Sequence, residues 1–398
     1  MSISQAVILA GGFGKRLGPI TANVPKPLVK VAGQPFLFHL IKQLKRENFT
    51  EIIILAGYKS NLFVDVIKNY KETSIKIKVI EQPTNFSTGA RIVHIMSQLN
   101  ENFLLLYGDN YCGISIKKLI EAFKKRSNII QLLAYEDLIN FSKPNLDIDN
   151  NSVVTIYDTE RKNKNLKYVD VGYMCVNKNV LKNISFFENL SLSKDVLSNL
   201  VKSKKICAYK TYNQYCTVGN MQRLQHARSM LDDRKFIFLD RDGVLNKKAN
   251  KGQYITKIED IEWREGSLEA LSFLKKNGFE TIVVTNQAGI GRGIVSENTV
   301  QDIHSAMCEQ ARHVGGSLDY IYICPHHWEE KCFCRKPMPG LFLKAQKDLC
   351  LDFSKLIFVG DQIVDREAAE TLQIKYLNLE PDEKLNKKII QVIQQMEK

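Results

Sequence analysis

Short apolar runs alternate with amphipathic stretches along this chain, and the alternation starts twice. It begins at residues 6–10 and again at residues 236–239, each time with a run typical of a buried strand. Strands that alternate with helix-length stretches are typical of βαβ units, in which helices cover a mainly parallel sheet. The pattern therefore predicts an α/β protein with two doubly wound domains. Strands are predicted at 6–10, 52–56, 75–80, 103–107, 236–239, 281–285, 320–324, 357–359 and 375–377, and helices near 36–47, 61–70 and 90–99.

The two series of elements meet near residues 232–234. A helical stretch over 221–233 ends in the charged cluster 232–235, and a new apolar strand starts at once. The length of 398 residues fits two or three domains. We expect domains at 1–232 and 233–398, with a β-rich portion at 129–176 inserted in the first domain or appended to it.

The positive charge of the chain is confined to its first part. The formal net charge is +13, and residues 1–232 hold 32 basic against 18 acidic side chains. A basic half suggests a nucleic-acid-binding protein. The lysines form no basic stripe, however, and no nucleic-acid motif accompanies them, so we expect no nucleic-acid partner. With 44% hydrophobic and 25% charged residues, the composition argues against a disordered tail, a collagen-like repeat or a disulfide scaffold.

Three features predict a soluble cytoplasmic protein. Residues 1–5 lead directly into the first strand without a signal-peptide pattern. The longest apolar runs hold about five residues, whereas a membrane-spanning helix needs ~20, so no membrane association is expected. The nine cysteines are an odd number, and Cys175 and Cys207 lie in apolar strand-like segments, which favours reduced thiols over disulfides. The oligomeric state is left open.

Two acidic residues, Asp240 and Asp242, follow the apolar strand at 236–239 and precede Gly243. In a doubly wound sheet, ligands bind at the carboxyl ends of the strands. One carboxylate there can attack phosphorus while its neighbour moves the proton of the leaving group. Two acids this close repel each other unless a divalent cation lies between them, which implies magnesium. The alternative for this segment alone is a polar loop after a strand.

Three further segments carry chemistry that suits a phosphoryl group. They supply a hydroxyl and amides at the end of a second strand, a pair of cations, and acids suited to a metal at the end of another strand. These residues are Thr285, Asn286 and Gln287; Arg335 and Lys336; and Asp361 and Asp365. In this order, the four segments resemble the four motifs of the haloacid dehalogenase-like phosphatases, over about residues 234–380.

This resemblance implies a Rossmannoid fold and a division of roles. Asp240 would be the nucleophile and Asp242 the general acid/base, while Thr285 and Lys336 would stabilise the phosphoryl oxygens. The implied Mg²⁺ ligands are Asp240, the backbone carbonyl of Asp242, and Asp361.

A second cluster lies directly before the cation pair. Cys324, His326, Cys332 and Cys334 fall within eleven positions, which matches a tetrahedral Cys₃His zinc site. Four protein ligands would make such a zinc structural, with the loop presenting the cations to substrate. The alternative is unrelated thiols on a loop. By analogy with the family, His326 is the fourth ligand and His327 is spare.

A zinc loop of this kind is found in two related phosphatase families, those for D-glycero-D-manno-heptose 1,7-bisphosphate and for histidinol phosphate. The segment 285–293 is similar to the heptose family's loop, and Arg292 would supply the cation that a second phosphate needs. The short spacer between His326 and Cys332 is closer to the histidinol type. We expect the heptose substrate, with Asn286, Gln287, Arg292 and Arg335 as substrate-binding residues.

A glycine-rich turn follows the first strand of the chain. Such a turn lets backbone amides approach phosphates, and a dinucleotide site is one candidate. However, the spacing is not that of the dinucleotide motif, and Arg16 lies where its helix would begin. With the following segments 17–21 and 24–28, the turn resembles the sugar-1-phosphate nucleotidyltransferases, which have a glycosyltransferase-A-like fold. The implied nucleotide-binding residues are Leu9, Ala10, Gly11, Gly12, Gly14, Lys15, Gln82 and Gly89.

The resemblance covers about residues 1–225 and also implies catalytic roles. Arg16 would neutralise the leaving pyrophosphate, and Lys26 would bridge the nucleotide and the sugar phosphate. Asp109 would be a Mg²⁺ ligand, and Asp170 and Glu160 would lie near the sugar.

The chain departs from this family at two positions. Thr217 stands where a second metal-binding Asp is usual, and Glu160 is followed by Arg161 where the family has Lys. The first change replaces a carboxylate with a neutral hydroxyl. It leaves open whether this half transfers nucleotides or only binds a sugar nucleotide.

Together, these features predict a bifunctional enzyme that uses sugar phosphates and a nucleoside triphosphate, with Mg²⁺ at both sites and a structural Zn²⁺. It would remove the 7-phosphate of heptose 1,7-bisphosphate and join heptose 1-phosphate to a nucleoside monophosphate for lipopolysaccharide. GTP is the expected donor by pathway analogy. The rivals are a phosphatase for histidinol phosphate or another small ester, and a non-catalytic first half that regulates the phosphatase.

Overall fold

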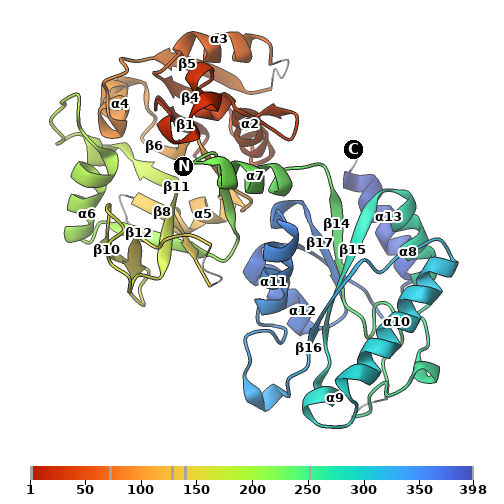
Figure 1. Ribbon diagram of the computed structural model, residues 1–398. Helices are drawn as coiled ribbons and strands as arrows, with labels where there is room; N and C mark the ends of the chain where they lie inside the picture. The colour runs from red at the N-terminus through yellow and green to blue at the C-terminus, as the bar shows by residue number, and fades with distance from the viewer. Residues whose placement is uncertain (1–2, 71–73, 127–129, 139–140, 251, 397–398) are drawn as a thin grey trace. The chain divides into compact units, whose positions relative to one another are not determined.

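Parallel strands form the centre of two separate units of the chain. The computed structural model describes residues 3–70, 74–126, 130–138, 141–250 and 252–396, and it divides into the first unit, Met1–Asp232, and the second unit, Asp233–Lys398 (Figure 1). Each unit has its own sheet.

The first unit is built on a nine-stranded mixed sheet. In its parallel half the strand order is β5-β4-β1-β6, so the central β1 lies between β4 and β6. The chain first adds strands on one side of β1 and then returns to its other side. This reversal of strand order creates a crevice at the carboxyl ends of β1 and β6, where ligands bind in such sheets. These strands are β1 Gln5–Ala10, β4 Glu51–Ala56, β5 Lys76–Glu81 and β6 Asn102–Tyr107.

The other half of this sheet is largely antiparallel. The ten-residue strand β11 (Tyr168–Asn177) pairs antiparallel with both β6 and β8, and β12 pairs parallel with β8. The strands at 129–176 therefore continue the sheet, and the mainly parallel arrangement holds for only one half of it. Alternation of apolar runs cannot reveal this, because a strand buried on both faces has the same pattern whichever way its neighbours run. The remaining strands are β2 Lys30–Val31, β3 Gln34–Pro35, β7 Asn110–Cys112, β8 Ile130–Glu136, β9 Leu146–Ile148, β10 Val154–Tyr157, β12 Ile206–Thr211 and β13 Tyr215–Thr217.

Helices of the first unit follow the strands at the predicted places. The amphipathic α2 spans Phe36–Arg46 and buries Phe36, Leu40 and Leu44 against the unit's core. The other helices are α1 Pro19–Asn23, α3 Ser60–Lys68, α4 Thr88–His94, α5 Ile116–Lys124, α6 Ser198–Lys202 and α7 Met221–Met230.

The second unit has a five-stranded sheet that is parallel throughout. Its strand order is β16-β15-β14-β17-β18, so the reversal lies between β14 and β17. Helices α8, α10 and α13 lie on one side of the sheet, and α11 and α12 lie on the other (Figure 1). The strands are β14 Lys235–Leu239, β15 Phe279–Asn286, β16 Tyr320–Cys324, β17 Ile357–Gly360 and β18 Lys375–Asn378. The helices are α8 Ser267–Lys276, α9 Ala288–Gly291, α10 Glu297–His313, α11 Gly340–Leu349, α12 Ile363–Leu372 and α13 Leu385–Met396.

Alternate residues of β14 contribute to two different cores. Ile237 and Leu239 pack with apolar residues of α8, α10 and α13. Phe238 packs instead on Phe342 of α11, with ring centroids 5.0 Å apart, and on Phe353 and Phe358. Burial on both faces holds β14 in place, so the residue after Leu239 is delivered to the carboxyl edge of the sheet.

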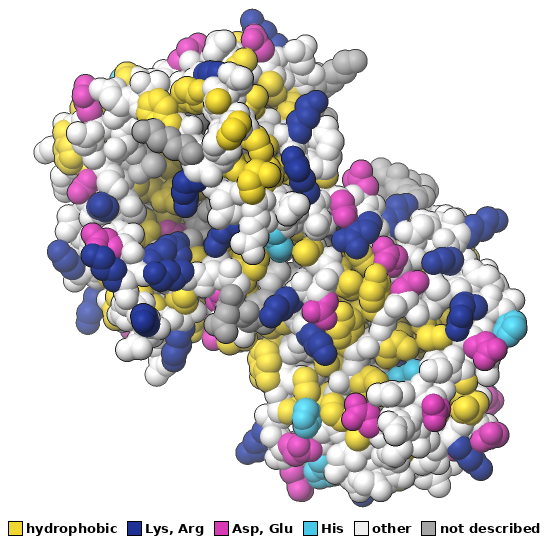
Figure 2. Space-filling model, viewed as in Figure 1, with side chains coloured by type: hydrophobic (Ala, Val, Ile, Leu, Met, Phe, Trp, Pro, Cys, Tyr) yellow, Lys and Arg dark blue, Asp and Glu magenta, His cyan; other side chains and the backbone are white. Residues whose placement is uncertain are grey.

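No helix among the described residues is long and apolar enough to cross a membrane. On the face in view, the Lys and Arg side chains are scattered rather than joined in a stripe (Figure 2).

We predict that Phe342→Ala destabilises the second unit by about 3–5 kcal/mol, because it leaves a cavity in the aromatic cluster. Ile258→Ala is the matched control, since Ile258 is 42% exposed, and it should change the free energy of unfolding by less than about 0.5 kcal/mol. Both tryptophans of the chain, Trp263 and Trp328, lie in the second unit, so urea unfolding followed by tryptophan fluorescence reports on this unit. Equal stabilities of the two variants would contradict the packing described.

Candidate active sites

Three neighbouring strands of the second unit end in polar side chains at the carboxyl edge of the sheet. Asp240 directly follows β14, Thr285 lies near the end of β15, and Asp361 follows β17. Asp240 and Thr285 line a cavity of about 560 Å³ together with Arg335, Lys336 and Asp365. The sheet topology therefore brings together side chains that are more than 100 residues apart in sequence.

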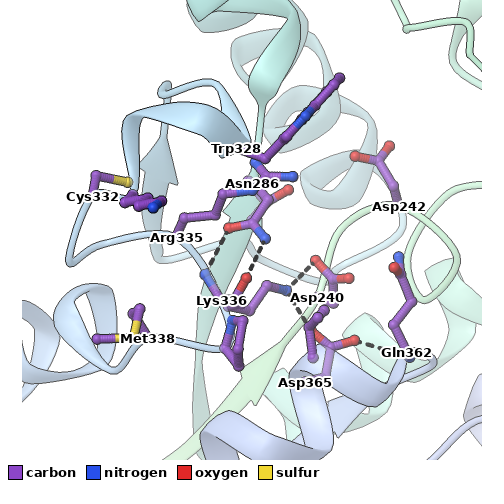
Figure 3. Close-up of a pocket in the computed structure, with 14 residues that line it drawn as sticks. Asp240, Asp242, Asn286, Trp328, Cys332, Arg335, Lys336, Met338, Gln362 and Asp365 are labelled. Carbon is purple, nitrogen blue, oxygen red and sulfur yellow. Dashed lines mark hydrogen bonds and ion pairs between the residues drawn. The ribbon is translucent and has the colours of Figure 1, made fainter.

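A buried lysine joins two carboxylates at the floor of this cavity. Lys336 Nζ lies 2.8 Å from Asp240 Oδ1 and 2.7 Å from Asp365 Oδ1 (Figure 3). Burial raises the pKa of Asp240 to about 7, although the Lys336 ammonium opposes this. For Lys336, the two carboxylates outweigh burial and raise its pKa. Both Lys336 Nζ and the Arg241 N–H contact Oδ1 of Asp240, so Oδ2 is the oxygen left for attack on a substrate.

Asp242 is held by a separate set of donors. Its carboxylate forms an ion pair with Arg241 at 2.9 Å and accepts hydrogen bonds from Gln287 Nε2 at 2.8 Å and Asn246 Nδ2 at 2.9 Å. Although burial raises the pKa of Asp242, these donors outweigh burial and hold it below its usual value. In Figure 3 its carboxylate lies apart from the group around Lys336.

Arg241 is itself held in place by two buried side chains. It donates to Gln287 Oε1 at 2.9 Å, and Nη1 lies 3.0 Å from His304 Nε2. Because a guanidinium can only donate, His304 Nε2 must be the unprotonated acceptor. Burial and the neighbouring Arg241 lower the pKa of His304 to about 3, which keeps the ring neutral.

Three carboxylates of the second unit can hold a cation. Oxygens of Asp240, Asp361 and Asp365 lie within 4.8 Å of one another. Asp361 Oδ1 is buried without a hydrogen-bond partner, while its Oδ2 lies 2.5 Å from Lys248 Nζ. An orphaned carboxylate oxygen in an all-oxygen cluster suits a hard divalent cation such as Mg²⁺.

The predicted substrate-binding residues occupy different places around the cavity. Asn286 lines it but also fixes the cation loop, accepting from the Lys336 N–H at 3.0 Å and donating to its carbonyl at 3.2 Å. The exposed Arg292 lies over the rings of Tyr254 and Trp328, at 5.7 and 5.4 Å from their centroids. Trp328 lines the cavity, so the guanidinium is held at its rim.

The four predicted zinc ligands form one cluster. The Sγ atoms of Cys324, Cys332 and Cys334 are 3.5–3.6 Å apart, and His326 Nδ1 lies 3.1 Å from Cys334 Sγ and 3.7 Å from Cys324 Sγ. Zinc–sulfur bonds of about 2.3 Å in a tetrahedron place the sulfurs about 3.8 Å apart, so this cluster has the size of a Cys₃His zinc site. His327 caps the short helix 328–330 and stacks on Trp328, with ring centroids 3.8 Å apart.

The loop after β1 forms part of a cavity of about 600 Å³ in the first unit. Leu9, Ala10, Gly11 and Gly12 line it. Gly14 does not; a Cβ there would come within 2.9 Å of Lys26 Cγ, so this glycine allows Lys26 to pack against the loop. Gly89 also lies outside the lining and packs tightly against Leu190. The side chain of Lys15 lies outside the described part of the structure.

Lys26 and Asp109 meet at the edge of this cavity. Lys26 Nζ lies 3.1 Å from Asp109 Oδ2. Asp109 also lines a second cavity of about 510 Å³, together with Arg16, Asp170 and Thr217. The two cavities therefore adjoin at Asp109.

Asp170 and Thr217 lie on strands that border this second cavity. Asp170 lies on β11 beside a register shift and lines this cavity, and its carboxylate accepts a hydrogen bond from Tyr157 Oη at 2.6 Å. Burial raises the pKa of Asp170. Thr217 is opposite Asn110 in the β13–β7 pair and lines the same cavity as Asp109. Glu160 does not line the cavity and instead pairs with Lys162 at 2.5 Å.

Gln82 does not line the first cavity, whereas Arg91 does. Gln82 Nε2 donates to the Arg91 carbonyl at 2.9 Å, and Arg91 Nη1 donates to Gln82 Oε1 at 3.4 Å. Both ends of the Gln82 amide, a predicted nucleotide-binding group, are thus engaged by Arg91.

Comparisons with known proteins divide the chain in the same way. Residues 5–222 match the nucleotidyl transferase family, and residues 235–384 match the polynucleotide kinase 3 phosphatase family. The D-glycero-beta-D-manno-heptose-1,7-bisphosphate 7-phosphatase of Photorhabdus laumondii is 39% identical over 145 residues, which are 35% of this chain and 76% of that protein. The first part of the chain belongs to the nucleotidyl transferases, and the second to the heptose-bisphosphate phosphatases.

Two further relatives extend this finding. The D-glycero-alpha-D-manno-heptose-1,7-bisphosphate 7-phosphatase of the same organism is 38% identical to the phosphatase unit over 143 residues, which are 34% of this chain and 76% of that protein. For the nucleotidyl transferase unit, a crystal structure named for a glucose-1-phosphate thymidylyltransferase of Bacillus anthracis has a TM-score of 0.52 at 20% identity. It covers 57% of this chain and 95% of that one, and it shows the shared fold.

Sequence reasoning missed several residues that contribute to these sites. In the phosphatase unit they are Arg241, His304 and Trp328, and in the nucleotidyl transferase unit Arg91. Arg91 stands in the apolar run 89–93, where a charged residue needs an explanation.

Proposed function

We propose that the chain is a bifunctional enzyme of NDP-heptose formation. Its phosphatase unit removes the 7-phosphate of heptose 1,7-bisphosphate, and its nucleotidyl transferase unit joins the resulting heptose 1-phosphate to a nucleoside monophosphate. The observation that carries the proposal is the Asp240–Lys336–Asp365 group in one cavity with Asp242, combined with Arg292 at its rim. The two reactions are consecutive, which gives a reason for their fusion in one chain. We place the enzyme in the cytoplasm and its product in lipopolysaccharide synthesis.

The phosphatase reaction follows from the two carboxylates. Asp240 Oδ2 attacks the 7-phosphorus, and the bond from phosphorus to the sugar oxygen breaks. Asp242, whose donors favour its ionised form, must first take up a proton, which it then gives to that oxygen. Asp242 then takes a proton from water, whose oxygen attacks the phosphorus and releases phosphate and free Asp240. Lys336 and Thr285 neutralise and orient the phosphoryl oxygens.

Metal ions fit both parts of this unit. Mg²⁺ would be held by Asp240 and Asp361 with Asp365 close by, and it would neutralise charge between the carboxylates and the phosphate. Zn²⁺ would be held by Cys324, His326, Cys332 and Cys334 and would fix the loop that carries Arg335 and Lys336.

The nucleotidyl transferase reaction requires little covalent work from the protein. An oxygen of the sugar 1-phosphate attacks the α-phosphorus of the nucleoside triphosphate, and the bond to the bridging oxygen of pyrophosphate breaks. We assign Lys26 to the reacting phosphates, Arg16 to the pyrophosphate and Asp170 to the sugar pocket. Asp109 would bind Mg²⁺ without a second carboxylate, since Thr217 stands in its place.

A mixture of substrates tests the whole proposal. With Mg²⁺, heptose 1,7-bisphosphate of either anomer and each NTP in turn, we expect phosphate first and then pyrophosphate, because the second reaction uses the product of the first. Release of phosphate but of no pyrophosphate with any NTP would indicate that the first unit is a regulatory binding domain. Thr217, in place of the second metal-binding Asp, favours that alternative. Faster turnover of histidinol phosphate than of either bisphosphate would contradict the assignment of heptose bisphosphate as substrate. The short spacer between His326 and Cys332 would then be the feature that indicates the histidinol type.

Two single-site variants separate the two activities. We predict that Asp240→Asn lowers phosphate release by roughly three orders of magnitude or more, because it removes the nucleophile, and leaves pyrophosphate release from heptose 1-phosphate unchanged. Asp109→Asn should have the opposite effect. Loss of both activities in either variant, in protein with unchanged circular dichroism, would contradict the division into two sites.

Zinc analysis tests the role of the thiol cluster. We predict about one zinc per chain in the purified protein, and loss of this zinc in Cys332→Ser, because three ligands hold the ion less well than four. Phosphate release should fall with it, since the loop positions Lys336. Cys308→Ser, a half-buried cysteine outside the cluster, is the matched control. Equal zinc contents in the two variants would rule out this site.

A further inference from the structure

A buried arginine lies at the nucleotide cavity without a carboxylate partner. Arg91, in α4, is only 3% exposed and lines the cavity beside the β1 loop. Among the residues that the structure describes, none offers it a carboxylate within ion-pair distance; its acceptors are the carbonyls of Gly11 and Pro83 and the amide oxygen of Gln82. Burial of a charge with neutral partners alone is costly, so a ligand that completes its hydrogen bonds would be favoured there.

The guanidinium has donors to spare. It carries five N–H groups, and three hydrogen bonds are formed, at 3.1–3.4 Å. None of the described residues accepts a hydrogen bond from Nε. The amide of Gln82 is used at both ends by Arg91, so this wall of the cavity presents donors rather than a donor and an acceptor.

A wall of donors discriminates among nucleobases. The Hoogsteen edge of guanine presents two acceptors, O6 and N7, whereas adenine places an amino donor beside N7. Arginine on O6 and N7 is accordingly the commonest specific contact to guanine. Phe13 and Phe86 also line the cavity, and their rings offer stacking surfaces that any base can use. Stacking can therefore hold any base, whereas hydrogen bonds from Arg91 can distinguish one base from another.

We propose that Arg91 selects the nucleotide by donating hydrogen bonds to O6 and N7 of guanine. The proposal rests on the proposed nucleotidyl transferase function. It names the donor substrate as a guanine nucleoside triphosphate and assigns recognition of the base to Arg91 rather than to Gln82.

A purely structural role for Arg91 makes a different prediction. A Cβ on Gly11 would come within 2.2 Å of the Arg91 guanidinium carbon, and one on Gly57 within 2.6 Å of Nη2, so the loop backbone packs directly on this side chain. If Arg91 only supported the loop, its loss would weaken the binding of all nucleoside triphosphates equally. If Arg91 recognises the base, its loss weakens the binding of guanine nucleotides selectively.

Binding to base analogues separates these roles. The full chain carrying Asp240→Asn, which cannot consume ligands at the phosphatase site, is titrated calorimetrically with Mg²⁺ and GTP, ITP, 7-deaza-GTP, ATP, CTP or UTP. We expect ITP, which keeps O6 and N7, to bind as GTP does. We expect 7-deaza-GTP, which lacks the N7 acceptor, and ATP to bind at least fivefold more weakly.

Substitution of Arg91 then assigns the selectivity to this residue. In Arg91→Met the dissociation constants of GTP and 7-deaza-GTP should become equal, while those of CTP and UTP stay within about twofold. Arg46→Met, which removes an exposed arginine on α2, should retain the preference. The analogue series on the parent protein gives its answer even if Arg91→Met does not fold.

Three outcomes overturn the inference. Equal binding of GTP and 7-deaza-GTP would show that N7 accepts no hydrogen bond from the protein. An equal loss of affinity for all nucleotides in Arg91→Met would show that Arg91 only supports the loop. Tighter binding of CTP than of GTP would assign another base. In each of these cases nucleotide binding by the first unit stands, whereas absence of binding by every triphosphate would overturn the nucleotidyl transferase proposal as well.

Discussion

A lysine held on a carboxylate, at the carboxyl edge of a parallel sheet, is the interaction on which the site of each unit depends. In the phosphatase unit, Lys336 lies buried between Asp240 and Asp365. Removal of one partner from such a buried group is expensive, by about 3–5 kcal/mol, because a charge is left uncompensated. The group has a net negative charge even with the lysine present, and Asp361 adds to it. The same electrostatics that hold Lys336 therefore favour a divalent cation beside it.

The thiol cluster is linked to this group through the chain. Cys334 is two residues before Lys336, and Asn286 at the end of β15 binds both the N–H and the carbonyl of Lys336. The lysine is thus held by its backbone as well as by its ammonium. A metal on the four clustered ligands would stiffen the loop just before Lys336, and this would be the reason for a structural ion beside the proposed phosphatase site.

Strand ends could be predicted from the sequence, whereas contacts between distant segments could not. Asp240, Thr285 and Asp361 were predicted because each follows or ends an apolar run, and parallel strands bring such ends together. Pairing directions escaped prediction, since β8 and β11 are buried runs that suit either direction. The role of Arg91 could not be predicted for a related reason. Its contacts with Gly11 and Gln82 form only in the folded chain.

The uneven charge of the chain corresponds to the different tasks of its units. The cavities of the nucleotidyl transferase unit are lined by many basic and few acidic side chains. The basic residues are Arg16, Lys26, Arg91, Lys143, Arg161 and Arg223. Two phosphorylated substrates bring several negative charges into these cavities, and a positive surrounding lowers the cost of bringing them together. The proposed phosphatase reaction places the reacting phosphoryl group over the Asp240 carboxylate, so it needs acids at the reacting centre and cations around it. The net charge of this unit is near zero, since residues 1–232 account for the whole positive excess. Its site acids are each paired with a cation, as a buried charge requires: Asp240 and Asp365 with Lys336, Asp242 with Arg241, and Asp361 with Lys248.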